Sequence, residues 1–222
     1  PSEINYRANI YGFKALGVTR LISVSAVGSM RERIHPMDMV FPDQFFDRTR
    51  QRPQTFFGKG AAAHIAFSHP ICGNLHRRLY RAAKRRKFRA HGKGAYLCIE
   101  GPQFSTLAES EVFRSWKVSV IGMTNLPEAR LAREAQICYA TVALVTDYDC
   151  WKRGEKPVDV SQLLKYMQKN NANAQRLLRD VMVSLPEAPR DCPCRTALRQ
   201  AVLTDPKKIP AFARKYLKVL LK

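Results

Sequence analysis

The sequence predicts an α/β fold, and three observations support this prediction. The first is the stretch Ile137 to Val145, which is almost wholly apolar without alternation, as is typical of a strand covered on both faces. The second is that other β-rich apolar stretches alternate with segments whose apolar residues recur at helical spacing. The third is that three predicted strands end in polar or small residues, and α/β sheets bind ligands beyond the carboxyl ends of their strands. We therefore expect a small-molecule site at that edge.

The size and composition predict one domain, residues 1–222. With 222 residues and 45% hydrophobic content, the chain can form one substantial core. No apolar run approaches the roughly 20 residues that span a bilayer, and the first residues do not resemble a signal peptide. Six cysteines scattered along the chain are more typical of intracellular thiols than of a secreted disulfide framework. We expect a cytoplasmic protein without a membrane partner.

The charge is unusual for a small-molecule protein. The chain has 38 Lys and Arg against 18 Asp and Glu, a net charge of +20. Such an excess favours polyanions, including RNA, although a solvated basic surface is the simpler explanation for most charge runs. Residues 73–87 place Leu75 and Leu79 on one side of a predicted helix and basic residues around the rest. The basic cluster at 77–89 is therefore the best candidate for an RNA-binding face.

The first half of the chain contains several predicted elements. A helix is expected over residues 1–16, ended by Gly17. The β-rich LISVSAV then leads into a small-residue turn at 25–29, where backbone N–H groups are able to approach an anion. Residues 43–53 have no clean period, so they are expected to form a functional or interfacial loop. His64 lies in a short apolar stretch, where an ordinary structural histidine is the favoured interpretation.

The second half continues the alternation. It comprises a strand at 95–99, a helix from Ser105-Thr106 to about Trp116, a strand at 118–123, a helix at 126–135 and the strand from Ile137. Glu109 follows Thr106 by three residues, which is the spacing of a capping box. A helix over 160–178 follows, and the chain finishes in the amphipathic FARKYLKVLLK.

Two short motifs carry chemistry of their own. Asp147 and Asp149 come at the end of the buried strand, where α/β sheets bind ligands, so they are candidate ligand-binding residues. It is an equally good interpretation that the two acids only begin a loop or cap the next helix. Cys192-Pro193-Cys194 is able to form a labile disulfide, to bind metal or to remain as two thiols.

Longer strings resemble a known family. PSEINYRANI, DQFFDRTRQRPQTFF, IEGPQFSTLAES, IGMTNLPEARLAREAQICYA and ALVTDYDCW are similar to the S-methyl-5′-thioadenosine phosphorylases, of the trimeric purine nucleoside phosphorylase family, and the similarity covers essentially the whole chain. The resemblance implies the nucleoside phosphorylase fold, with a central mixed twisted sheet flanked by helices. It also implies phosphorolysis of 5′-methylthioadenosine to adenine and 5-methylthioribose 1-phosphate, in purine and methionine salvage. Inorganic phosphate is the co-substrate, and no metal or organic cofactor is expected.

The resemblance also assigns residues to the purine and the ribose. Asp147 and Asp149 match the pair that reads the purine: a neutral Asp near N7 relieves the charge that builds on the leaving base, and a carboxylate accepts from the 6-amino group. A carboxylate there favours a 6-amino over a 6-oxo purine. Phe104 matches the aromatic residue that packs against the base, and Met123 lies under the ribose.

The remaining assignments concern phosphate and the 5′ end of the nucleoside. Ser25, Ala26 and Thr124 match phosphate-side positions, where hydroxyl and backbone donors suit an oxyanion. Val160 and Leu163 match the apolar slot for the 5′-methylthio group. The slot is closed by a neighbouring subunit in the family, and His64 matches the histidine that reaches across. This replaces the structural interpretation of His64 and implies a homotrimer.

Two further expectations follow from the comparison with that family. Its chains start before the residue that corresponds to Pro1, with a Gly-rich phosphate loop and an Arg-His pair, so the N-terminal strands are expected to be absent here. The paired cysteines of similar prokaryotic phosphorylases suggest a stabilising redox role for Cys192 and Cys194.

The alternative function is that of an inactive or repurposed family member that serves as a basic structural subunit of an RNA-containing, ribosome-like assembly, with an organellar location. The net charge supports this alternative.

Overall fold

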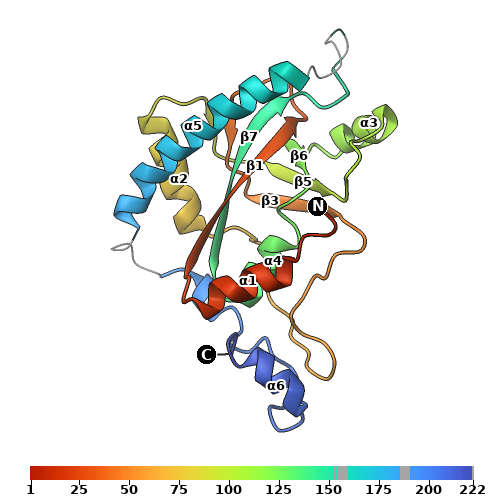
Figure 1. The fold of residues 1–222 in the computed structure, drawn as a ribbon, viewed down its shortest axis with the longest axis vertical. Helices are drawn as coiled ribbons and strands as arrows, with labels where there is room; N and C mark the ends of the chain where they lie inside the picture. Colours follow the sequence, from red (N-terminus) through yellow and green to blue (C-terminus); the bar gives the residue numbers. More distant parts are fainter. Residues whose placement is uncertain (153, 155–159, 186–190, 222) are drawn as a thin grey trace.

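The computed structural model describes residues 1–152, 154, 160–185 and 191–221; at 160, 162 and 163 only the backbone is described. Within these residues seven strands form one mixed sheet in the order β3-β5-β6-β1-β7-β2-β4 (Figure 1). The strands are β1 (Arg20–Ser29), β2 (Met39–Val40), β3 (Gln44–Arg48), β4 (Ala90–His91), β5 (Ala95–Ile99), β6 (Val120–Gly122) and β7 (Cys138–Asp147). The helices are α1 (Tyr6–Ala15), α2 (Gly73–Arg85), α3 (Leu107–Ser115), α4 (Glu128–Glu134), α5 (Val160–Ser184) and α6 (Ala211–Leu217), with a 3₁₀ helix at Pro193–Thr196. The mixed sheet with flanking helices confirms the predicted fold class.

The predicted central strand is confirmed as β7. Every residue of β7 except the last, Asp147, is buried, because β1 pairs with it in parallel on one side, β2 pairs with it on the other, and helices cover it. The predicted turn at 25–29 is wrong. The strand β1 continues to Ser29, since Gly28 and Ser29 also pair with Ile121 and Val120 of β6.

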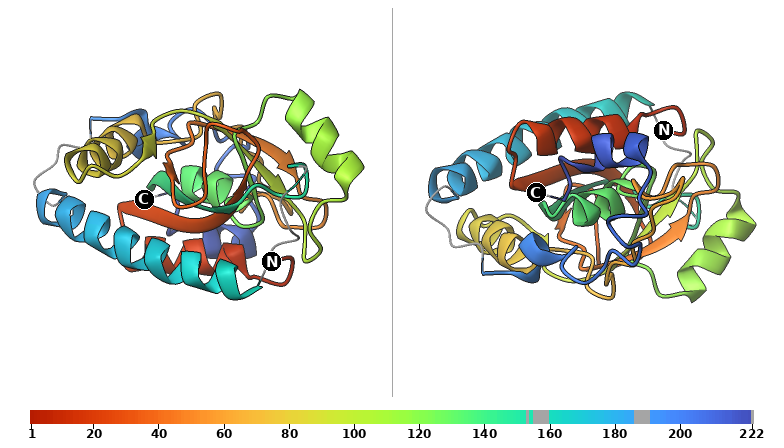
Figure 2. Two further views of the ribbon diagram at one scale, coloured as in Figure 1. Left: turned by 90° about the horizontal axis from the view of Figure 1, so that it is seen from above. Right: turned by 90° about the horizontal axis from the view of Figure 1, so that it is seen from below.

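The helices lie against the sheet in separate groups. The helices α2 and α5 contact one another and β7, whereas α1 packs on α4, which also contacts β7. Both views in Figure 2 place α3 at the opposite side of the sheet from α2 and α5. The predicted helix at 1–16 is confirmed from Tyr6 onward, with Asn5 rather than an earlier residue as its N-cap, and Gly17 (φ 79°) follows its end.

Residues 43–53 do not form the expected loop throughout. Gln44–Arg48 are β3, an edge strand that pairs in parallel with β5. Because an edge strand is only partly covered, Phe46 stays exposed within it and the apolar alternation is weak. The predicted capping box is confirmed, since Thr106 and Glu109 bond to each other at the start of α3.

The carboxyl-terminal segment, residues 191–221, folds back onto the sheet. The N–H of His64 donates to the carbonyl of Ala201 (2.8 Å), and the N–H of Leu203 donates to that of Ala62 (2.9 Å). The segment also buries apolar residues in the core, namely Leu198, Ile209, Leu217 and Leu220. Of the described helices, none has the length and apolar character needed to cross a bilayer.

Candidate active site

The two acids Asp147 and Asp149 lie together at the carboxyl end of β7. The N–H of Asp149 donates to Asp147 Oδ1 (2.7 Å), and the Thr146 hydroxyl donates to Asp147 Oδ2 (2.6 Å). The Ser110 hydroxyl of α3 donates to Asp149 Oδ2. Burial raises the pKa of Asp149 above its usual range, and the neighbouring charge of Asp147 acts in the same direction. The two acids thus lie in direct contact, with both Asp147 oxygens accepting a hydrogen bond and Asp149 partly buried beside them.

Three hydroxyl groups meet between β1, β5 and β6, around Ser25, which lies three residues before the β1 residue that pairs with Asp147. Ser25 Oγ lies 3.1 Å from Thr124 Oγ1 and 3.1 Å from Tyr96 Oη. Ser25 and Tyr96 are buried, and Thr124 is the second residue after β6, whereas Ala26 is exposed on β1. Three hydroxyls in contact offer donors that are able to turn toward an oxyanion.

Two glycines allow these side chains to approach one another. A Cβ at Gly28 would lie 3.0 Å from Asp147 Oδ1 and 3.3 Å from the N of Asp149. A Cβ at Gly122 would lie 2.0 Å from Tyr96 Oη, a distance that no real contact shows. The absence of side chains here thus places Asp147 against β1 and the Tyr96 hydroxyl beside Ser25.

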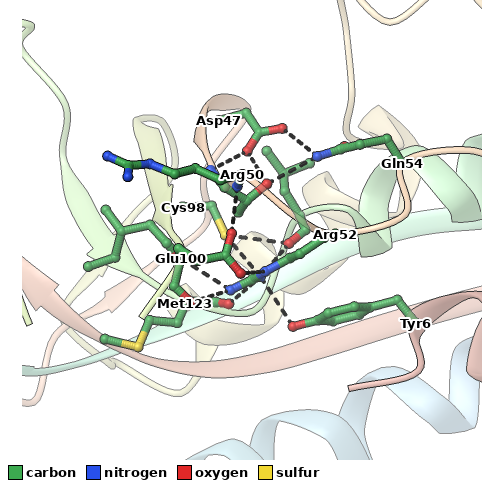
Figure 3. Close-up of polar contacts among 11 residues, drawn as sticks. Tyr6, Asp47, Arg50, Arg52, Gln54, Cys98, Glu100 and Met123 are labelled. Atoms are coloured by element: carbon green, nitrogen blue, oxygen red, sulfur yellow. Dashed lines mark hydrogen bonds and ion pairs between the residues drawn. The ribbon is translucent and has the colours of Figure 1, made fainter. Parts of the chain in front are cut away.

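The buried Arg52 holds the two loops that follow β5 and β6 (Figure 3). Its guanidinium donates to the carbonyls of Met123 (2.7 Å), Leu126 (2.7 Å) and Glu100 (2.6 Å). It also forms an ion pair with the Glu100 carboxylate (3.1 Å) and contacts the Tyr6 hydroxyl (3.2 Å). Since Met123 and Thr124 lie in one of these loops, Arg52 positions the site without lying among its hydroxyls.

The structure does not bring every predicted site residue to this edge. Phe104 follows Glu100 in the loop but is 81% exposed. His64 is exposed in the segment that bonds to residues 201–203, away from the carboxyl end of β7. The side chains of Val160 and Leu163 lie outside the described residues, although both positions fall in α5.

Four functional positions escaped the sequence analysis. Arg52 and Tyr96 belong to predicted elements, but nothing in their spacing indicates which partners they meet. Gly122 is an ordinary strand glycine by sequence. Ser110 carried a usable signal, because it lies three residues before Phe113 on the buried face of α3, where a polar residue is unexpected.

The basic cluster at 77–89 forms the expected exposed face. Leu75, Leu79, Ala82 and Ala83 are buried, and most basic side chains of α2 are exposed. Arg86 is paired with Asp180 of α5, with Nε–Oδ2 at 2.6 Å. The helix is therefore amphipathic as predicted, and its basic residues form part of the surface.

Comparison with known proteins identifies relatives over the whole chain. The family model described as "Phosphorylase superfamily" matches residues 1–182. The S-methyl-5′-thioadenosine phosphorylase of Geobacter sulfurreducens is 52% identical over 222 residues, all of this chain and 77% of the relative. That of Koribacter versatilis is 49% identical over 221 residues, covering 100% and 75% of the two chains.

Solved structures of methylthioadenosine phosphorylases have the same fold as this chain. A methylthioadenosine phosphorylase from an antarctic soil metagenomic library superimposes with a TM-score of 0.96 at 46% identity, covering 100% of this chain and 78% of that one. The methylthioadenosine phosphorylase of Schistosoma mansoni in complex with adenine gives a TM-score of 0.86 at 30% identity, covering 91% and 79%. These relatives give no support to the hypothesis of a subunit in an RNA-containing assembly.

Proposed function

Since the chain belongs to the phosphorylase superfamily and, within it, to the S-methyl-5′-thioadenosine phosphorylases, we propose that it catalyses the phosphorolysis of 5′-methylthioadenosine to adenine and 5-methylthioribose 1-phosphate. The observation that carries the proposal is that β1 links the two groups: Gly28 pairs with Asp147, which bonds to Asp149, and Ser25, three residues earlier in β1, contacts the Thr124 hydroxyl. A site for a purine thus adjoins a site for an anion, as the reaction requires.

The acids act on the leaving base. When the bond between C1′ and the purine breaks, electrons flow into the ring, and a proton or a donated hydrogen bond at N7 stabilises the resulting charge. We assign this task to Asp147 and the recognition of the 6-amino group to Asp149. The bond from the Asp149 N–H to Asp147 fixes the spacing of the two carboxyl groups, so they meet one edge of the purine together.

The other assigned side chains hold the phosphate and the sugar. Ser25 and Thr124 are proposed to turn their hydroxyls from each other to inorganic phosphate, with Ala26 beside them on β1. Met123 lies against the loop at Gly101, where a Cβ would be 2.6 Å from its sulfur, and we place it under the ribose. The reaction needs no metal or organic cofactor in this scheme.

The test is phosphate-dependent release of adenine from 5′-methylthioadenosine. Asp147→Ala is expected to lower kcat/KM by about 10²-fold or more, the usual scale for a positioned acid, with the unfolding midpoint little changed. An Asp205→Ala variant serves as the matched control, because Asp205 is an exposed acid in the carboxyl-terminal segment. Near-parental kinetics for Asp147→Ala would reject the assignment.

A homotrimer is the proposed assembly. His64 lies away from the acid pair of its own chain, and large apolar side chains are exposed on β3, on α3 and on the residues that flank α3, namely Phe46, Phe104, Leu107, Val112 and Trp116. An exposed apolar face of this kind is typical of a surface covered by another chain. Sedimentation equilibrium is expected to give three chains per particle, with Leu107→Glu shifting the mass toward one chain. A single-chain mass for the parent would reject the trimer.

A further inference from the structure

Four of the six cysteines meet in one cluster far from the candidate active site. The sulfur atoms of Cys72, Cys138, Cys192 and Cys194 all lie within 4.8 Å of one another. They come from three separate parts of the chain: the start of α2, the start of β7, and the segment that begins the 3₁₀ helix. Figure 1 shows these three elements meeting at the amino end of β7. Neighbouring residues along a strand are about 3.3 Å apart, so Asp147 at its other end is roughly 30 Å away.

The backbone fixes this arrangement independently of the sulfur atoms. The N–H of Cys72 donates to the carbonyl of Tyr139 (2.8 Å), which joins the start of α2 to the second residue of β7. The N–H of Leu198 is bonded to the Gln136 side chain (3.5 Å), which lies just before β7. The thiols are therefore brought together by elements that are already in place.

The geometry suits a tetrahedral metal ion. Zinc binds thiolate sulfur at about 2.3 Å, which places the four sulfurs of a regular tetrahedron about 3.8 Å apart. All four cysteines are free in the structure, and the sulfurs of Cys138 and Cys192 lie 3.3 Å apart. A tetrahedron of this size fits within the observed limit of 4.8 Å. Four soft thiolate ligands select zinc over magnesium or calcium.

The surroundings suit a closed structural site. Cys72, Cys138 and Cys194 are each only 2% exposed, so no open position is left for a substrate. Four thiolates around Zn²⁺ carry a net charge of −2, which needs positive neighbours. Cys72 is the N-cap of α2, where the helix dipole favours negative charge, and the buried Arg133 acts electrostatically on Cys194.

We propose that Cys72, Cys138, Cys192 and Cys194 bind one Zn²⁺ as a structural site that fastens the carboxyl-terminal segment to the sheet. Binding exchanges four thiol protons for one metal ion, and no electron is transferred. The ion joins residues 192–194 to both α2 and β7, so it holds the segment that pairs with residues 62–64. This ion takes no part in the reaction, and the proposal does not depend on the activity.

The test is zinc binding by the untagged, fully reduced protein. We expect one Zn²⁺ per chain by mass spectrometry of the metal content, and a cobalt-loaded sample with the absorption bands of tetrahedral thiolate coordination. The double variant C192S/C194S is expected to lose the metal. Cys98→Ser keeps it, because Cys98 is a buried cysteine outside the cluster. With free zinc roughly 100-fold above its dissociation constant, the parent is expected to unfold about 5–10 °C higher than after chelation.

Failure of the reduced protein to bind zinc would overturn the proposal. The same four sulfurs are able to form two disulfides instead, and this alternative predicts oxidised cysteines and no affinity for zinc after reduction. Zinc uptake by the reduced parent that is no greater than that of C192S/C194S overturns the proposal. Uptake of one equivalent that Cys98→Ser retains and the double variant lacks supports it, whatever the oxidation state on isolation.

Discussion

Arg52→Met should destabilise the protein severely, because Arg52 is a fully buried cation with several partners at once. The substitution preserves a long apolar stem but leaves the carbonyls of Met123, Leu126 and Glu100 without their donor and the Glu100 carboxylate without its counter-ion. Removing one partner of a buried ion pair costs about 3–5 kcal/mol, and each orphaned buried carbonyl adds about 1–3 kcal/mol unless water reaches it. Glu100 is 21% exposed, so water solvates its unpaired carboxylate and removes most of the ion-pair cost; the three carbonyls, at the lower half of their range, leave an expected loss of about 3–5 kcal/mol.

The measurement is urea unfolding followed by tryptophan fluorescence at one fixed protein concentration, since assembly changes apparent stability. For a chain of this length the expected loss lowers the melting temperature by roughly 6–20 °C. The matched control is Arg50→Met, because Arg50 is exposed and its guanidinium points away from the cluster in Figure 3. The control should change stability by less than about 0.5 kcal/mol. An Arg52→Met variant within about 1 kcal/mol of the parent would show that the hydrogen bonds of Figure 3 do not hold these loops.

Two further predictions concern the acid pair. Burial and the charge of Asp147 raise the pKa of Asp149, so the Asp149 carboxylate that accepts from the 6-amino group forms at a higher pH than for an exposed Asp. As the pH falls through this raised pKa, kcat/KM should therefore fall. Asp149→Asn should remove this acid limb of the pH profile and weaken the preference for 6-amino over 6-oxo purines. An acid limb and a preference unchanged in Asp149→Asn would exclude this role. Gly28→Ala should lower kcat/KM by about 10- to 100-fold, because its Cβ would displace the Asp147 carboxylate, while Gly12→Ala, with no atom within 4 Å of its Cβ, should not. Parental kinetics in Gly28→Ala would refute that reasoning.

The elements with a strong local pattern were predictable from the sequence. The continuous apolar run predicts β7, the two-sided charge distribution predicts α2, and the Thr106–Glu109 spacing predicts the start of α3, since each depends on neighbours in the chain. The edge strand β3 was missed because its burial depends on one distant partner, β5. The contacts of Arg52 were missed for the same reason, because its partners lie 46 residues before it and up to 74 residues after it in the chain.

The same contrast applies to the site. Asp147 and Asp149 were predictable as candidates, since two acids after a buried strand must lie at its edge. The cysteine cluster was not, because Cys72, Cys138 and the 192–194 pair belong to segments whose meeting depends on the tertiary fold. The contact between the carboxyl-terminal segment and the start of β7 produces no periodic pattern in the local sequence.

The contact between Gly122 and Tyr96 has an evolutionary consequence. With the tyrosine in place, any side chain at position 122 would collide with its hydroxyl at 2.0 Å, so Tyr96 restricts position 122 to glycine. A lineage acquires a larger residue at 122 only after position 96 has first become shorter, and that earlier step gives up the hydroxyl beside Ser25. The order of substitutions is therefore constrained in one direction. Among descendants, a tyrosine at 96 should therefore never occur together with a side chain larger than glycine at 122.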